Sequence, residues 1–148
     1  ETFAPATNEA VNEKTAYYMI ELMKGVVEGG TGGRIRSRYE LRYPIAGKTG
    51  TVENYTRIEG VRTQLTDHSL FVAFAPVNNP KIALAVYIEN GYYGARYAGH
   101  IASLLIEKYL KGEISRKDLE RRMLEKTLEH EYAKPYSGEE FKINEYVW

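Results

Sequence analysis

The stretch Ile45-Ala46-Gly47-Lys48-Thr49-Gly50-Thr51-Val52-Glu53 decides how the rest of this chain is interpreted. Its apolar and β-branched ends favour a strand, but its middle consists of small and polar residues. A glycine inside a strand commonly marks the close approach of another backbone or of a ligand. A lysine and two hydroxyls beside such a gap can bind a carboxylate or an oxyanion. An isolated Lys-Thr-Gly is more often part of an exposed surface strand, so its surroundings have to decide between the two.

Length and composition are those of a single globular domain. The chain has 148 residues, of which 43% are hydrophobic and 27% charged, enough for a real core. Lysine plus arginine (20) equals aspartate plus glutamate (20), so no net charge favours nucleic acid as a partner. The absence of cysteine excludes disulfides and thiolate metal sites. Because the sequence starts at Glu1 without a leader-like segment, we expect a processed chain or a piece of a longer one.

Hydrophobic patterns predict an α+β fold around a three-stranded antiparallel sheet. Strands are expected at about residues 45–53, 67–75 and 82–89. The last two are nearly unbroken apolar runs, which predicts cover on both faces, and the short turn between them makes them antiparallel neighbours. The Lys-Thr-Gly strand should pair with the first of these runs and lie at the sheet edge. Residues 54–66 are polar and lack clear periodicity, so we expect a long hairpin excursion there.

Helices are expected at about residues 12–28, 95–111 and 116–132, after an extended lead-in over residues 1–7. Residues spaced three and four apart predict their buried stripes. The expected stripes are Ala16, Met19, Ile20, Met23, Val26 and Val27, then Ala98, Ile101, Ala102, Leu105, Ile106 and Tyr109, and then Leu119, Met123, Leu124 and Leu128.

Capping residues set the expected ends of these helices. Asn8 or Asn12 is a candidate N-cap for the first helix, which Gly29 and Gly30 end. Gly112 ends the second. Ser115 is the expected cap of the third, and Asp118 in its first turn suits the helix dipole. We therefore divide the chain into a first unit, residues 1–112, and a C-terminal helical extension and tail, residues 113–148.

A glycine-rich turn, Gly29-Gly30-Thr31-Gly32-Gly33-Arg34, precedes the Lys-Thr-Gly strand. A flexible connector is a better interpretation than a phosphate cradle. Arginines then follow at even spacing, which in an extended segment places them on one face. Such a face is usually only solvated, but a positive rim that attracts an acidic substrate is an alternative. These arginines are Arg34, Arg36, Arg38 and Arg42.

Nucleotide and metal chemistry are both poorly supported. A phosphate-binding loop G-x-x-x-x-G-K-[ST] would need glycine where Arg42 stands, and it would open a helix rather than continue as a strand. The three histidines, His68, His100 and His130, lack paired ligand spacing. His68, next to Asp67 at a strand entrance, is expected to have an ordinary turn role. We expect no cofactor and no metal.

Acyl-transfer chemistry fits the stretch best. Lys-Thr-Gly is one of three motifs of penicillin-binding proteins and class A β-lactamases. An edge strand allows an extended peptide to add as a further strand. Gly50 permits that approach, and Lys48, Thr49 and Thr51 can bind the carboxylate of the peptide. A strand N–H there can form half of an oxyanion hole.

The order of elements extends this likeness beyond the tripeptide. Residues 16–112 resemble the C-terminal half of the transpeptidase domain of class B penicillin-binding proteins, most closely the penicillin-binding protein 2 type that acts in cell elongation. The resemblance implies a partial β-lactamase/transpeptidase-like fold, with Lys48 and Thr49 lining the active site and Thr51 giving an oxyanion N–H. The segments that carry it are Val26-Val27-Glu28-Gly29-Gly30-Thr31-Gly32, Ala46-Gly47-Lys48-Thr49-Gly50-Thr51, Asp67-His68-Ser69-Leu70-Phe71-Val72-Ala73-Phe74-Ala75-Pro76, Ala83-Leu84-Ala85-Val86 and Glu89-Asn90-Gly91.

The reacting serine of that family has no counterpart here. None of the five serines begins Ser-x-x-Lys or Ser-x-Asn, so we expect the chain to supply one wall of an active site and to be inactive alone. The serines are Ser37, Ser69, Ser103, Ser115 and Ser137.

The resemblance implies a fragment of a D,D-transpeptidase that cross-links peptidoglycan stem peptides and is acylated by β-lactams. Its parent would lie at the periplasmic side of the inner membrane. A β-lactamase or β-lactam sensor of the same fold remains open, as does a non-catalytic interaction module suggested by residues 116–132. Because residues 82–88 would expose an apolar sheet edge, we expect self-association or pairing with the missing N-terminal half.

Overall fold

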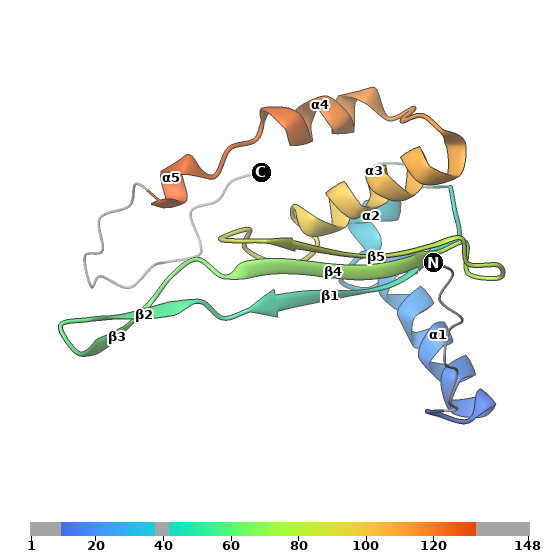
Figure 1. Ribbon diagram of the computed structural model, residues 1–148, viewed down its shortest axis with the longest axis horizontal. Helices are drawn as coiled ribbons and strands as arrows, with labels where there is room; N and C mark the ends of the chain where they lie inside the picture. Colours follow the sequence, from blue (N-terminus) through green and yellow to red (C-terminus); the bar gives the residue numbers. More distant parts are fainter. Residues whose placement is uncertain (1–9, 38–41, 133–148) are drawn as a thin grey trace, which may run out of the picture.

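A computed structural model describes residues 10–37 and 42–132. Its centre is a three-stranded antiparallel sheet of β1 (Ala46–Val52), β4 (His68–Ala75) and β5 (Ile82–Ile88) in the order β1-β4-β5. Helix α3 (Ala98–Lys111) lies along one face, and helix α1 (Glu13–Glu28) projects from the sheet, with its C-terminal end nearest the strands (Figure 1). The predicted α+β class, strand pairing and edge position of the Lys-Thr-Gly strand are confirmed. The lead-in, Asn8, Arg38 and the tail from residue 133 lie outside the described residues.

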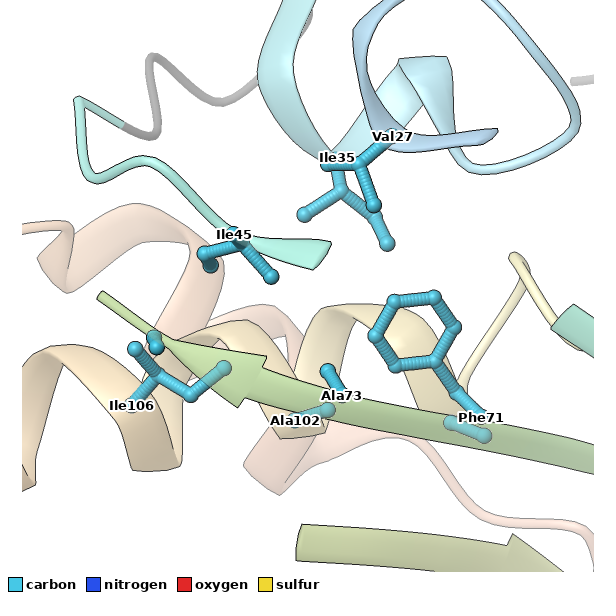
Figure 2. Close-up of a cluster of buried hydrophobic side chains, with 9 residues drawn as sticks. Val27, Ile35, Ile45, Phe71, Ala73, Ala102 and Ile106 are labelled. Carbon is cyan, nitrogen blue, oxygen red and sulfur yellow. The ribbon is translucent and has the colours of Figure 1, made fainter. Parts of the chain in front are cut away.

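The hydrophobic core lies between the sheet and α3. Alternate residues of a strand point to opposite faces, and the register pairs Thr49 with Phe71 and Phe71 with Val86. Phe71 is 1% exposed and packs in a cluster with Ala102 and Ile106 of α3 (Figure 2). The other buried members of that cluster are Val27, Ile35, Ile45, Ala73, Ala75 and Ala98.

The prediction that β4 and β5 are covered on both faces is wrong for the described residues. Along β4, buried residues alternate with half-buried ones, and along β5 half-buried residues alternate with exposed ones. α3 packs on one face only. The opposite face, which we call the open face, carries Lys48, His68, Leu70, Val72, Phe74, Ala83, Ala85 and Tyr87.

The polar segment after β1 forms a second two-stranded sheet, of β2 (Tyr55–Ile58) and β3 (Val61–Gln64). It projects beyond the end of the main sheet (Figure 1). Glu59 and Gly60 both have positive φ, 49° and 84°, which matches the twist that a two-residue hairpin turn requires. The excursion was predicted as a hairpin, but its strands were missed because their exposed faces leave no hydrophobic alternation.

Residues Gly33–Ser37 form a short helix, α2, so the expectation of an extended segment there is wrong. Ile35 decides this, since it is 1% exposed and packs into the core cluster. On a helix, residues two apart do not share a face. Arg34 therefore points toward Tyr93, with Nη1 3.5 Å from the phenolic oxygen, whereas Arg36 Nη2 donates to the carbonyl of Tyr43 at 3.0 Å.

The ends of α1 and α3 agree with the sequence. Asn12 caps α1, because its Oδ1 accepts a hydrogen bond of 2.9 Å from the Thr15 amide. Gly112, with φ 82°, ends α3 in the left-handed conformation. The predicted stripes are partly wrong: the exposed members are Met19 on α1, and Leu105 and Tyr109 on α3.

The predicted single helix over residues 116–132 is two helices, α4 (Lys117–Glu125) and α5 (Glu129–Tyr132). Lys126 is extended, and the Thr127 hydroxyl accepts a hydrogen bond from the Glu129 amide at 3.1 Å. A threonine in that place supports the start of a new helix. Leu119 is buried as expected and Asp118 lies in the first turn, but Leu124 is 81% exposed.

A buried ionic cluster attaches α4 to α3. Glu107 is 3% exposed, and its Oε2 accepts a hydrogen bond of 2.8 Å from Arg116 Nε. Arg116 also donates to the carbonyl of Ser103 at 2.7 Å. The Ser115 hydroxyl, expected to cap α4, instead donates to Glu107. This cluster explains why Ser103 and Glu107, rather than Leu105 and Tyr109, lie on the buried side of α3.

Arg116→Ala should destabilise the protein by about 3 kcal/mol, because it leaves a buried carboxylate without its cation. Arg121→Ala, within α4, is the matched control for Arg116, the N-cap residue of that helix. Arg121 pairs with Asp118 at 2.8 Å, but both side chains are more than half exposed, so this change should cost about 0–1 kcal/mol. Urea denaturation of the two variants measures the difference, and equal effects would contradict the assignment of a stabilising role to the cluster.

Glu107 also makes the stability depend on pH. Burial raises the pKa of its carboxyl, but the hydrogen bonds from Ser115 and Arg116 outweigh burial and leave the pKa below its usual 4.5. A lowered pKa in the folded state adds stability above the unfolded value, and this is lost as the pH falls through the folded value. The difference in melting temperature between the wild type and Glu107→Gln should therefore narrow below about pH 4.5. A constant difference from pH 7 to pH 3 would contradict this.

Candidate active site

Strand β1 presents the Lys-Thr-Gly stretch at an edge of the sheet. Its ladder partners all lie on β4, with Lys48 opposite Val72 and Gly50 opposite Leu70. Within the described residues, no strand pairs with the other side of β1. The main-chain groups on that side are therefore available to a further strand.

Lys48 is exposed and lies on the open face. Its ammonium donates a hydrogen bond of 2.5 Å to the carbonyl of Thr49. Main-chain groups of alternate residues in a strand point to the same side, so the Thr51 N–H lies on the same side of β1 as this carbonyl. The lysine cation and a main-chain donor therefore flank Gly50 on one side of the strand.

Thr49 lies on the opposite face from Lys48 and is 8% exposed. Its hydroxyl oxygen is 2.6 Å from that of Thr31, in the glycine-rich turn after α1. This turn was interpreted as a flexible connector, but it contacts the motif directly. The Lys-Thr-Gly tripeptide gives no sign of that contact.

Gly94, in the loop before α3, packs against the backbone of Gly50 from the covered side of the sheet. A Cβ atom on Gly94 would lie 2.4 Å from the carbonyl oxygen of Leu70 and 2.8 Å from the amide nitrogen of Gly50. The loop between β5 and α3 therefore packs directly on the β1–β4 backbone. For a Cβ on Gly50 the nearest atoms would instead belong to the side chain of Leu70, at 3.3 Å. Sequence reasoning identified Gly50 but missed Gly94, whose only signal is its place in a turn.

Polar side chains hold that loop on the sheet. The buried Ser69 hydroxyl donates to the Tyr93 carbonyl at 3.0 Å and accepts from the Ala98 amide at 3.3 Å. The main-chain N–H of Asn90 donates to His68 Nδ1 at 3.0 Å. His68 thus accepts a turn hydrogen bond, in keeping with its expected turn role.

The three serines whose side chains are described make structural contacts. Ser69 binds the loop before α3, the Ser103 hydroxyl donates to the His100 carbonyl at 2.7 Å, and Ser115 binds Glu107. None of them faces the Lys48 side of the sheet as a free hydroxyl.

Residues 10–37 and 42–132 also lack two other features. They contain no group of three or more histidine, aspartate or glutamate side chains that could hold a metal ion. None of their helices has both the length and the apolar character needed to span a membrane.

Residues 3–107 match the family of the penicillin-binding protein transpeptidase domain. The peptidoglycan D,D-transpeptidase MrdA of Acinetobacter baumannii is 42% identical over 87 residues, 54% of this chain and 12% of the relative. The MrdA of Haemophilus influenzae is 32% identical over 95 residues, 60% of this chain and 15% of the relative. The chain therefore spans only a small part of the length of these relatives.

Solved structures give the same result. Penicillin-binding protein A of Mycobacterium tuberculosis, as its penicillin G acyl-enzyme, is 32% identical with a TM-score of 0.53, covering 69% of this chain and 22% of the other. A crystal structure of PBPA from Mycobacterium tuberculosis is likewise 32% identical with a TM-score of 0.53, covering 71% of this chain and 23% of the other. Because the family match extends over most of the sequence and the MrdA relatives are D,D-transpeptidases, this chain belongs to the penicillin-binding protein transpeptidase family, as part of a transpeptidase domain of the penicillin-binding protein 2 type.

Proposed function

We propose that this chain forms the Lys-Thr-Gly wall of the active site of a peptidoglycan D,D-transpeptidase. The enzyme cross-links stem peptides and is acylated by β-lactams. One observation carries the proposal: the Lys48 ammonium and the Thr51 N–H share one side of an edge strand, on either side of Gly50. The nucleophilic serine, its lysine base and the Ser-x-Asn motif belong to a part of the domain that this chain does not contain.

Each residue of the wall has a chemical role. Lys48 binds the carboxylate of the stem peptide or of the β-lactam from the open face, and the hydroxyls of Thr49 and Thr51, on the other face of β1, reach the same carboxylate at the free edge of the strand. The Thr51 N–H donates to the oxyanion that develops when the serine attacks the carbonyl; a donor of this kind typically contributes a factor of about 10² or more in rate. Gly50 leaves the open face free of bulk, so that the substrate's main chain can lie along β1.

The unpaired edge of β5 indicates how this chain could associate with other chains. Within the described residues β5 pairs only with β4, and an unpaired edge favours pairing with another chain. We expect the isolated chain to self-associate, or to pair with the rest of its domain when that is supplied. Sedimentation velocity tests this, and a monomer at micromolar concentration with no response to the remaining part of the domain would contradict it.

The names of the relatives favour a transpeptidase over the alternatives. MrdA of both species is a D,D-transpeptidase, whereas a β-lactamase or a sensor would share the fold but not that activity. A parent enzyme of this kind would work at the periplasmic side of the inner membrane, where peptidoglycan is assembled.

Labelling with a fluorescent penicillin tests the proposed function. The full-length protein that contains these residues should form a stable covalent adduct, and peptide mapping should locate it on a serine of a Ser-x-x-Lys motif outside this chain. The isolated chain should not be labelled. A folded full-length protein that does not react would contradict the proposal, and rapid release of the label would indicate a β-lactamase instead.

A further inference from the structure

We propose that Thr31 is a positioning residue for carboxylate binding, acting through Thr49. The inference rests on the proposed function and extends it to a residue outside the Lys-Thr-Gly motif. Its basis is the contact between two side chains 18 residues apart, whose hydroxyl oxygens are 2.6 Å from each other.

The turn that carries Thr31 is folded tightly onto the end of α1. The Gly30 amide donates to the Gly25 carbonyl at 3.0 Å, and the Gly32 amide donates to the Val26 carbonyl at 2.9 Å. A Cβ atom on Gly30 would lie 2.9 Å from the Cα of Val26, and one on Gly32 would lie 3.1 Å from its carbonyl oxygen. The glycines on both sides of Thr31 therefore let the turn come close enough to be held, and the turn presents the Thr31 hydroxyl to β1.

The direction of the hydrogen bond between the two hydroxyls decides what Thr49 offers a ligand. Each hydroxyl has one proton and can also accept. When Thr31 donates, the Thr49 proton is free for a substrate carboxylate. When Thr49 donates to Thr31, it presents only lone pairs, which repel a carboxylate. Because an ionised carboxylate can only accept hydrogen bonds, a carboxylate bound to Thr49 selects the first arrangement, and the linked hydroxyls strengthen one another.

The test compares two substitutions in the full-length protein. Thr31→Val keeps the shape of the side chain and removes the donor, whereas Thr31→Ser keeps the donor. The readout is the second-order acylation rate constant for a penicillin and for its methyl ester, which lacks the negative charge. We expect Thr31→Val to slow acylation by the free acid about fivefold, as for the loss of one hydrogen bond, and to leave the ester rate unchanged. Thr31→Ser should restore the wild-type rate.

The control is Thr63→Val in β3, which removes a hydroxyl whose only hydrogen bond among the described residues is a 3.4 Å contact to Val61 within its own hairpin. This control should leave both rates unchanged. An equal loss for acid and ester with Thr31→Val, or no loss at all, would overturn the positioning role. Lys48→Ala separates the two proposals. If it too leaves the free-acid rate unchanged, the proposed function fails; if it slows acylation while Thr31→Val does not, only the role of Thr31 fails.

Discussion

Gly94→Ala should destabilise the protein by about 3 kcal/mol, among the largest effects expected of a single methyl group. The added Cβ would lie 2.4 Å from the Leu70 carbonyl oxygen, 2.7 Å from the Gly50 carbonyl oxygen and 2.8 Å from the Gly50 amide nitrogen. All three are main-chain atoms of paired strands, so none can turn aside as a flexible side chain would. Either the loop lifts off the sheet or β1 moves away from β4.

Gly25→Ala is the matched control, since the same methyl group is added where there is room. A Cβ on Gly25 meets no atom within 4 Å, and the residue lies inside α1. Alanine favours a helix over glycine, so this change should stabilise the protein by roughly 0.5–1 kcal/mol. Urea denaturation compares the two variants. Wild-type stability in Gly94→Ala would show that the loop does not press on the strand.

The sheet was predictable because its signals are local. A five-residue turn between two apolar runs, residues 76–80, leaves little choice but antiparallel pairing, and the Lys-Thr-Gly strand was polar enough to be placed at the edge. How much of each face is covered was not predictable. An apolar run such as β5 shows what a strand can bury, whereas its actual cover depends on which elements pack against it.

The errors fall where a distant contact overrides the local pattern. Even spacing suggested an extended segment at Arg34 and Arg36, but the burial of Ile35 in the core stabilises a helix there. Hydrophobic spacing placed Leu105 on the inner side of α3, but Glu107 lies there instead because Arg116, beyond the end of the helix, pairs with it. A buried ion pair carries no hydrophobic signal.

In the candidate site, too, residues set by a local pattern were predictable and residues set by a distant contact were not. The motif itself identified Lys48, Thr49 and Thr51, because their chemistry is contained in consecutive residues. Thr31 and Gly94 were missed, since each reaches β1 from a different element. No periodicity or motif spacing relates these positions to one another, so only the folded chain can reveal them.

Lys48→Ala should lower the second-order acylation rate of the full-length protein by about 10²–10³-fold, as expected when a charged donor that stabilises the reacting complex is removed. Stability should stay within about 0.5 kcal/mol of wild type. The side chain is exposed, and its hydrogen bond goes to the main-chain carbonyl of the adjacent residue, so it does not link distant parts of the fold. The change therefore separates function from folding, as Gly94→Ala cannot.

Lys81→Ala is the control for a general loss of positive charge, because Lys81 is also exposed but lies next to β5. It should acylate at the wild-type rate. The loss in Lys48→Ala should also be larger for a free penicillin than for its methyl ester, since only the free acid presents a carboxylate. Lys48→Arg keeps the charge but not the compact ammonium, so it should recover only part of the rate. Undiminished acylation in Lys48→Ala would remove the lysine from the site, because no other described cation on β1 could take its place.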